Sequence, residues 1–139
     1  MSTPTPPKVV NRTIKREFFR HWGLFEAETK TRLPLRLAFA GLWTACDREG
    51  RFQWQPEVLK VAILPYDKVD FSGVLDALGA NGFLVKYTIE GREYGWVPKF
   101  LKHQAINGRE VQSVLPPPPG DLMLFDEPTS ALDPELVGD

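Results

Sequence analysis

The sequence predicts a single α+β domain, because one part of the chain shows helical periodicity and another alternates between apolar and polar residues. The strongest helical pattern covers residues 33–50, and the strongest alternation lies on both sides of Gly91. A chain of 139 residues, 42% of them hydrophobic and 12% aromatic, is long enough to build one packed core. We therefore expect one folded domain that combines several helices with a β-hairpin.

Composition divides the chain into four parts. Residues 1–10 hold three prolines among Ser and Thr, so we expect them to be disordered. Residues 11–112 contain the periodic segments and form the expected domain. Residues 113–120 include a run of four prolines and are expected to be a stiff, solvated linker. Residues 121–139 form an acidic tail.

The first expected element is a short basic amphipathic helix over residues 11–22. Its apolar residues at helical spacing are Ile14, Phe18, Phe19 and Trp22. Its basic residues are Arg12, Lys15, Arg16 and Arg20. The basic face is either an ordinary solvated face or an arm that contacts phosphate groups, and the two alternatives are compatible. Residues 26–32 are expected to be a charged connection to the next helix.

The central helix is expected over residues 33–50, with Arg48 and Gly50 marking its end. Its apolar stripe consists of Leu35, Phe39, Leu42, Trp43 and Cys46. Cys46 is the only cysteine, which excludes an intrachain disulfide and a multi-cysteine zinc site. Its place on the stripe favours a buried structural thiol over a nucleophile.

The remaining elements follow in order along the chain. Residues 51–55 alternate like a short strand. Residues 56–64 form a predicted helix, whose expected inward residues are Val58, Leu59, Ala62 and Ile63. Another helix begins at Asp70 or Ser72 and ends at residues 81–82. Residues 83–90 and 92–97 form a predicted hairpin around Gly91, and a last short helix is expected over residues 98–106.

This order of elements is that of a winged helix-turn-helix domain with a C-terminal β-hairpin wing. In that arrangement the third helix normally enters the major groove of DNA. Here the corresponding segment, residues 70–81, holds Asp70 and Asp76 and neither Lys nor Arg. Base reading relies on Arg, Lys, Asn and Gln side chains, so phosphate contacts from other elements are expected to supply most of any DNA affinity.

Five phrases of the sequence resemble a known family. They are RTIKREFF (residues 12–19), LAFAGLW (37–43), DREGRF (47–52), GFLVKY (82–87) and FLKHQAI (100–106). Together they are similar to the N-terminal winged-helix domain of phage and prophage replication-initiation proteins of the replisome-organiser type. The resemblance covers about residues 11–112 and implies a DNA-binding domain. That family normally carries a further C-terminal region for recruiting replication partners, and we expect that region to be missing here.

The tail carries a second resemblance. Residues 122–135, LMLFDEPTSALDPE, are similar to the Walker B strand and following loop of ABC-transporter ATPases. In that family the position of Asp126 helps to hold Mg²⁺ and that of Glu127 polarises the attacking water. None of the 11 glycines here is followed by lysine, so the phosphate-binding loop is absent. We interpret residues 121–139 as a foreign fragment joined to the domain, with a docking tail as the alternative.

Other functional classes find little support in the sequence. His21 and His103 are isolated from other potential ligands or triad partners, so we expect no metal, no cofactor and no catalytic residue. No apolar run is long enough for a membrane span and no signal peptide is evident, so the expected location is the cytoplasm. Residues 1–110 carry 17 basic and 12 acidic side chains, a net charge of +5.

The sequence therefore favours a non-enzymatic DNA-binding protein, either replication-initiation-like or a transcription regulator. Its expected partner is double-stranded DNA, with no membrane and no small-molecule substrate, and a homodimer stays open. The expected DNA-contacting residues are Arg12, Lys15, Arg16, Arg20, Lys86 and Arg92. The alternative is a winged-helix module for protein–protein association, which the acidic third helix and the aromatic N-terminal segment favour.

Overall fold

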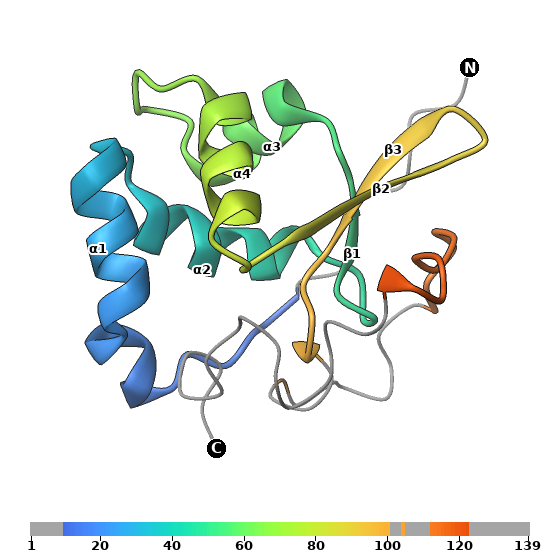
Figure 1. Ribbon diagram of the computed structural model, residues 1–139, viewed down its shortest axis with the longest axis horizontal. Coiled ribbons are helices and arrows are strands. Elements are labelled where there is room, and N and C mark those ends of the chain that lie inside the picture. The colour runs from blue at the N-terminus through green and yellow to red at the C-terminus, as the bar shows by residue number, and fades with distance from the viewer. Residues whose placement is uncertain (1–9, 101–103, 105–111, 123–139) are drawn as a thin grey trace.

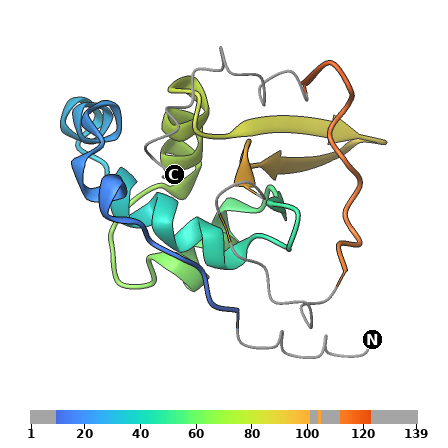
Figure 2. The ribbon, with the colours of Figure 1, turned by 90° about the horizontal axis from the view of Figure 1, so that it is seen from below.

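The computed structural model describes residues 10–100, 104 and 112–122 (Figure 1). In chain order its elements are η1 (Arg16–Arg20), α1 (Trp22–Thr31), α2 (Leu35–Ala45), β1 (Arg51–Gln53), α3 (Pro56–Ile63), α4 (Phe71–Ala80), β2 (Val85–Ile89) and β3 (Arg92–Trp96). Helices and an antiparallel sheet are thus combined, which confirms the predicted α+β class. Figure 2 shows the β2–β3 hairpin projecting away from α1.

Helix α2 lies at the centre of the core, as its apolar stripe predicts. It packs against α1, α3 and α4. The stripe residues Leu35, Phe39, Leu42, Trp43 and Cys46 are all buried. The Trp43 ring meets Phe18 and Phe39 edge to face, with ring centroids 5.3 Å apart in each pair. This contact ties η1 to the middle of the core.

The end of α2 differs from the prediction. The helix stops at Ala45 rather than near Gly50, because Cys46 takes an extended backbone conformation. The Asp47 carboxylate then accepts hydrogen bonds from the amides of Glu49 (2.9 Å) and Arg51 (3.0 Å). These bonds build a turn that leads the chain directly into β1.

The predicted basic helix over residues 11–22 is wrong in its extent. Residues 10–15 have no regular structure, η1 is a 3₁₀ helix, and α1 starts only at Trp22. His21 separates the two, because its Nδ1 accepts a hydrogen bond from the Leu24 amide (2.9 Å) and caps α1. Residues 26–32, expected to be a connection, instead form the second half of α1 up to its left-handed end at Arg32 (φ 59°).

The predicted apolar face of the N-terminal segment is also largely wrong. Phe18 is buried, whereas Ile14, Phe19 and Trp22 are at least half exposed. Helix α1 is attached to the core by Leu24 and Ala27, which are three residues apart and buried. Most of the apolar side chains in residues 11–22 therefore lie on the surface and not in the core.

Helices α3 and α4 follow the sequence prediction closely at their ends. Pro56 opens α3, and the Asp70 carboxylate caps α4 by accepting a hydrogen bond from the Ser72 amide (3.0 Å). Helix α4 ends before Gly82, whose φ of 83° turns the chain toward β2.

The expected inward face of α3 is only half correct. Leu59 is buried and Ile63 is half-buried against the core. Val58 and Ala62 were expected to point inward, but both are exposed. Helices α2 and α4 cover only a narrow face of this short helix, so that not all of its apolar residues can be buried.

The sheet has the strand order β1-β3-β2, and all its pairs are antiparallel. The predicted hairpin is confirmed, with Glu90 (φ 51°) and Gly91 (φ 79°) forming a tight turn of the type that suits twisted strands. Phe52 on β1 lies opposite Gly95 on β3, and its ring fills the space that a side chain at residue 95 would need. This face of the sheet packs on the helices.

The opposite face of the sheet is covered by the proline-rich segment. The buried cluster on this face of the sheet consists of Val85, Tyr87, Tyr94 and Trp96. Leu115 and Leu122 pack against this cluster, and Pro118 is buried. In Figures 1 and 2 the orange segment accordingly runs beside the hairpin, on the side away from α1. The expectation of a solvated linker over residues 113–120 is therefore wrong.

Two predictions fall largely outside the described residues. A last helix is expected over residues 98–106. Among its described residues, the backbone N–H of Gln104 donates a helical hydrogen bond to the Phe100 carbonyl (2.9 Å). The Walker B-like part of the tail lies outside the described residues, apart from Leu122. In the part of the chain that the structure describes, no helix has the length and apolar character needed to cross a bilayer.

Candidate nucleic-acid interface

Arg12, the first predicted DNA-contacting residue, is bound to the end of helix α2. Its Nε donates to the Trp43 carbonyl (3.0 Å) and its Nη2 donates to the Cys46 carbonyl (3.2 Å). Its guanidinium also lies over the Phe100 ring, 5.1 Å from the centroid. Arg12 thus satisfies carbonyl groups that the helix end leaves without intrahelical partners.

The other basic residues of the N-terminal segment lie at η1. Lys15 is half-buried at the start of this helix, and Arg16 and Arg20 are exposed. Neither arginine forms an ion pair with an acidic residue among those described. Two exposed guanidinium groups on one short element are suited to contacting phosphate groups.

Exposed aromatic residues lie close to these arginines along the chain. Phe19 and Trp22 are each 68% exposed, and Phe25 is 40% exposed. The Trp22 and Phe25 rings are 5.5 Å apart, and the Arg36 guanidinium lies 5.3 Å from the Phe25 centroid. Phe25 was not among the predicted surface residues. Its spacing of three from Trp22 is a helical signal that could have placed the two residues on one face of a helix.

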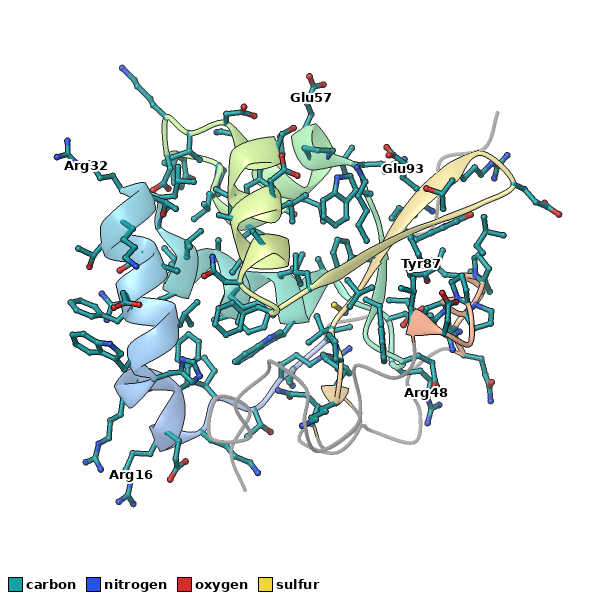
Figure 3. The ribbon with its side chains drawn as sticks, in the orientation of Figure 1. Arg16, Arg32, Arg48, Glu57, Tyr87 and Glu93 are labelled. Atoms are coloured by element: carbon teal, nitrogen blue, oxygen red, sulfur yellow. The ribbon has the colours of Figure 1, made fainter. Side chains whose placement is uncertain are left out.

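The two predicted wing residues differ in their surroundings. The Lys86 ammonium forms an ion pair with Glu93 (3.0 Å) and lies 4.9 Å from the Trp54 centroid, so it is held on the sheet. Arg92 is exposed next to the hairpin turn. Figure 3 shows Arg16 at one end of the molecule, whereas Glu93 lies on the hairpin at the other end. The predicted residues therefore form two separate patches rather than one surface.

Helix α4 offers an acidic and small-residue surface. Asp76 and Ala80 are exposed on it, and its N-cap Asp70 is exposed as well. The neighbouring surface of α3 is apolar, with Val58 61% and Val61 72% exposed. Helix α4 itself, residues 71–80, carries none of the Arg, Lys, Asn or Gln side chains that read bases in the major groove.

The buried side chains of His21 and Cys46 have structural roles. His21 is buried, with its ring 5.6 Å from that of Phe83, while His103 lies outside the described residues. Burial, assisted by the neighbouring Asp47 and opposed by Arg12, raises the pKa of the Cys46 thiol, which keeps it protonated. Among the described residues, no three His, Cys, Asp or Glu side chains come together as a metal site.

Comparison with protein-family models, with curated proteins and with solved structures gives no significant match to this chain.

Proposed function

We propose that the chain is a non-enzymatic, cytoplasmic DNA-binding protein with a winged-helix arrangement. The chain order α2-β1-α3-α4-β2-β3 and the strand order β1-β3-β2 support this arrangement. Both roles suggested by the sequence, replication initiation and transcription regulation, are compatible with such a module. Double-stranded DNA is the proposed ligand.

The observation that carries this proposal is the exposure of Arg16 and Arg20 on η1. Each guanidinium is free to form bidentate hydrogen bonds with a DNA phosphate, and binding releases condensed counterions. Arg12 contributes indirectly, because it holds the segment before η1 against the end of α2. Lys15 lies next to this patch, and Arg92 with Lys86 forms a second, weaker candidate patch on the hairpin.

The acidic surface of α4 makes base reading in the major groove unfavourable. Asp76 is exposed on that surface and would face phosphate groups if α4 entered the groove. We therefore assign the affinity to phosphate contacts at η1, which carry no sequence information directly. Binding of this kind is expected to be similar for duplexes of different sequence.

Two double variants test this assignment with equal changes in charge. Arg16→Ala with Arg20→Ala should weaken binding to a random duplex and flatten the salt dependence by roughly two units, at about 0.9 per contact. Lys30→Gln with Arg32→Asn removes the same charge from the far end of α1, where Lys30 pairs with Glu26. That control should bind like the unaltered chain, as measured by fluorescence anisotropy. Equal losses in both variants would contradict a site at η1.

Protein association is the second candidate function. It is favoured by the exposed rings of Phe19, Trp22 and Phe25, because large aromatic side chains are enriched in protein interfaces. Sedimentation of the chain at increasing concentration tests self-association through this surface. A dimer that Trp22→Ala dissociates, without DNA binding, would favour this function over the first.

A further inference from the structure

Residues 114–120 show a burial pattern with a period of three. Val114, Pro117 and Gly120 are exposed, whereas Leu115 is half-buried and Pro118 is buried. A polyproline II helix has three residues per turn, so positions three apart lie on one face. The run of prolines fixes φ near the value of this helix. Leu115 and Pro118 thus lie on one face of the segment, and Leu115 on this face packs against the sheet.

Side chains of the sheet region donate hydrogen bonds to the carbonyl groups of this segment. The Tyr87 hydroxyl donates to the Pro116 carbonyl (2.7 Å), and Arg51 Nη1 donates to the Leu115 carbonyl (3.1 Å). Figure 3 shows Tyr87 beside the segment that Figure 1 colours orange. Prolines offer carbonyl acceptors but no N–H donors, so a surface that binds them must supply donors. Tyr87 and Arg51 do so.

The floor beneath the segment is aromatic. The Tyr87 and Tyr94 rings are stacked with centroids 5.5 Å apart, and Trp96 belongs to the same buried cluster. Aromatic grooves with a few hydrogen-bond donors are the surfaces on which proline-rich ligands dock, since a preformed polyproline II helix loses little entropy on binding.

We propose that this outer face of the sheet is a binding site for a proline-rich segment of a partner protein. The chain's own residues 113–120 occupy the site as a tethered ligand. The pattern recognised is Leu-Pro-x-Pro, in which the Leu packs on the sheet cluster, as Leu115 does, and the last Pro is buried, as Pro118 is. The site is separate from the DNA-contacting patch at η1.

The tethered ligand leaves the site incompletely satisfied. Arg51 Nε is buried and meets no hydrogen-bond acceptor among the described residues, although Nη1 of the same guanidinium is bonded to Leu115. A ligand with an additional acceptor at this position would form hydrogen bonds with both Nε and Nη1 of Arg51. Such a ligand can displace the tethered segment. The tethered segment has the competing advantage of a high effective concentration, because it belongs to the same chain as the site.

The test uses the full chain and a labelled peptide with the sequence of residues 112–120. In the variant Leu115→Ser with Pro118→Ser, both inward side chains of the tethered segment are replaced. This variant should bind the peptide at least about tenfold more tightly than the unaltered chain, because the tethered competitor is weakened. The matched control, Val114→Ser with Pro117→Ser, changes two exposed residues of the same segment and should bind as weakly as the unaltered chain.

A second change tests the donor on the sheet. Tyr87→Phe, added to the variant with the weakened segment, keeps the ring but removes the hydroxyl, and should lower peptide affinity roughly threefold to tenfold. A peptide in which the two inward residues are Ser should not bind. If the double variant does not fold, the single change Pro118→Ala is used with the same peptide.

Three results would overturn the proposal. One is a folded variant that does not bind the peptide at about 1 mM, a concentration comparable to that of a tethered segment. Another is equal binding of the Leu-Pro-x-Pro peptide and its Ser-substituted form. The third is a dimer of the unaltered chain that the peptide dissociates, which would assign the site to the segment of a second copy instead of a partner protein.

Discussion

The Arg12 guanidinium caps the last turn of α2 through the carbonyl of Trp43, at 3.0 Å from Nε. A positive charge at this end of the helix also interacts favourably with the helix dipole. Since Trp43 contacts Phe18 of η1, the two residues connect the extended N-terminal segment, η1 and the core. This connection fixes the position from which Arg16 and Arg20 project.

Arg12→Ala is expected to destabilise the fold by about 1–3 kcal/mol, because it leaves the carbonyls of Trp43 and Cys46 without this donor. Urea denaturation followed by circular dichroism measures the change in the free energy of unfolding. Arg20→Ala is the control, since it removes an exposed arginine and should change stability by less than about 0.5 kcal/mol. Equal effects of the two changes would show that Arg12 has no structural role.

Trp43→Ala is expected to reduce the free energy of unfolding by about 3–5 kcal/mol, because a large buried ring leaves a cavity among Phe18, Phe39 and their neighbours. Trp22→Ala removes the same side chain from a site that is 68% exposed. That control should cost far less, which thermal and urea unfolding of both variants will measure. A neutral Trp43→Ala would contradict the assignment of α2 as the centre of the core.

Stability is expected to fall between pH 10 and pH 12 because of Tyr87. Burial raises the pKa of Tyr87 from its ordinary value of 10.0 to about 12, with Arg51 opposing and Asp47 and Tyr94 adding to the shift. Above pH 10 the unfolded chain loses a proton that the folded chain keeps. The unfolded state then binds fewer protons, so stability decreases as the pH rises.

Urea midpoints measured across this pH range test the assignment. Tyr87→Phe should make the fall between pH 10 and pH 12 smaller, whereas Tyr66→Phe, at a site 95% exposed, should leave it as it is. If Tyr66→Phe had the larger effect, the Tyr87 hydroxyl would not be the buried donor to Pro116 that the structure describes.

The elements predicted correctly from sequence are those whose signals are local. Helix α4 has its cap at Asp70 and its stop at Gly82, and the hairpin has a turn that Gly91 permits. The boundary at His21 was missed, because a histidine cap is a weak signal beside a continuous run of apolar residues. Leu24 and Ala27, which are three residues apart and buried in the structure, are the residues that identify α1.

The candidate sites depend on contacts that local patterns do not contain. Arg12 and Arg16 look alike in the sequence, yet one binds carbonyls at the end of α2 and the other is exposed. The docking of the proline run requires pairings with Tyr87 and Arg51, far away along the chain. A proline run by itself indicates an extended, stiff segment, and only the tertiary structure reveals the surface beneath it.

Binding of a random-sequence DNA duplex to the unaltered chain at several salt concentrations tests the proposed function most directly. With phosphate contacts from Arg16 and Arg20, we expect binding at low salt that weakens as salt rises, with a slope of log affinity against log salt of about −2 or steeper. Duplexes of unrelated sequence should give similar affinities. No detectable binding at low salt would contradict the proposal and leave the exposed surface of Phe19, Trp22 and Phe25 as a protein interface.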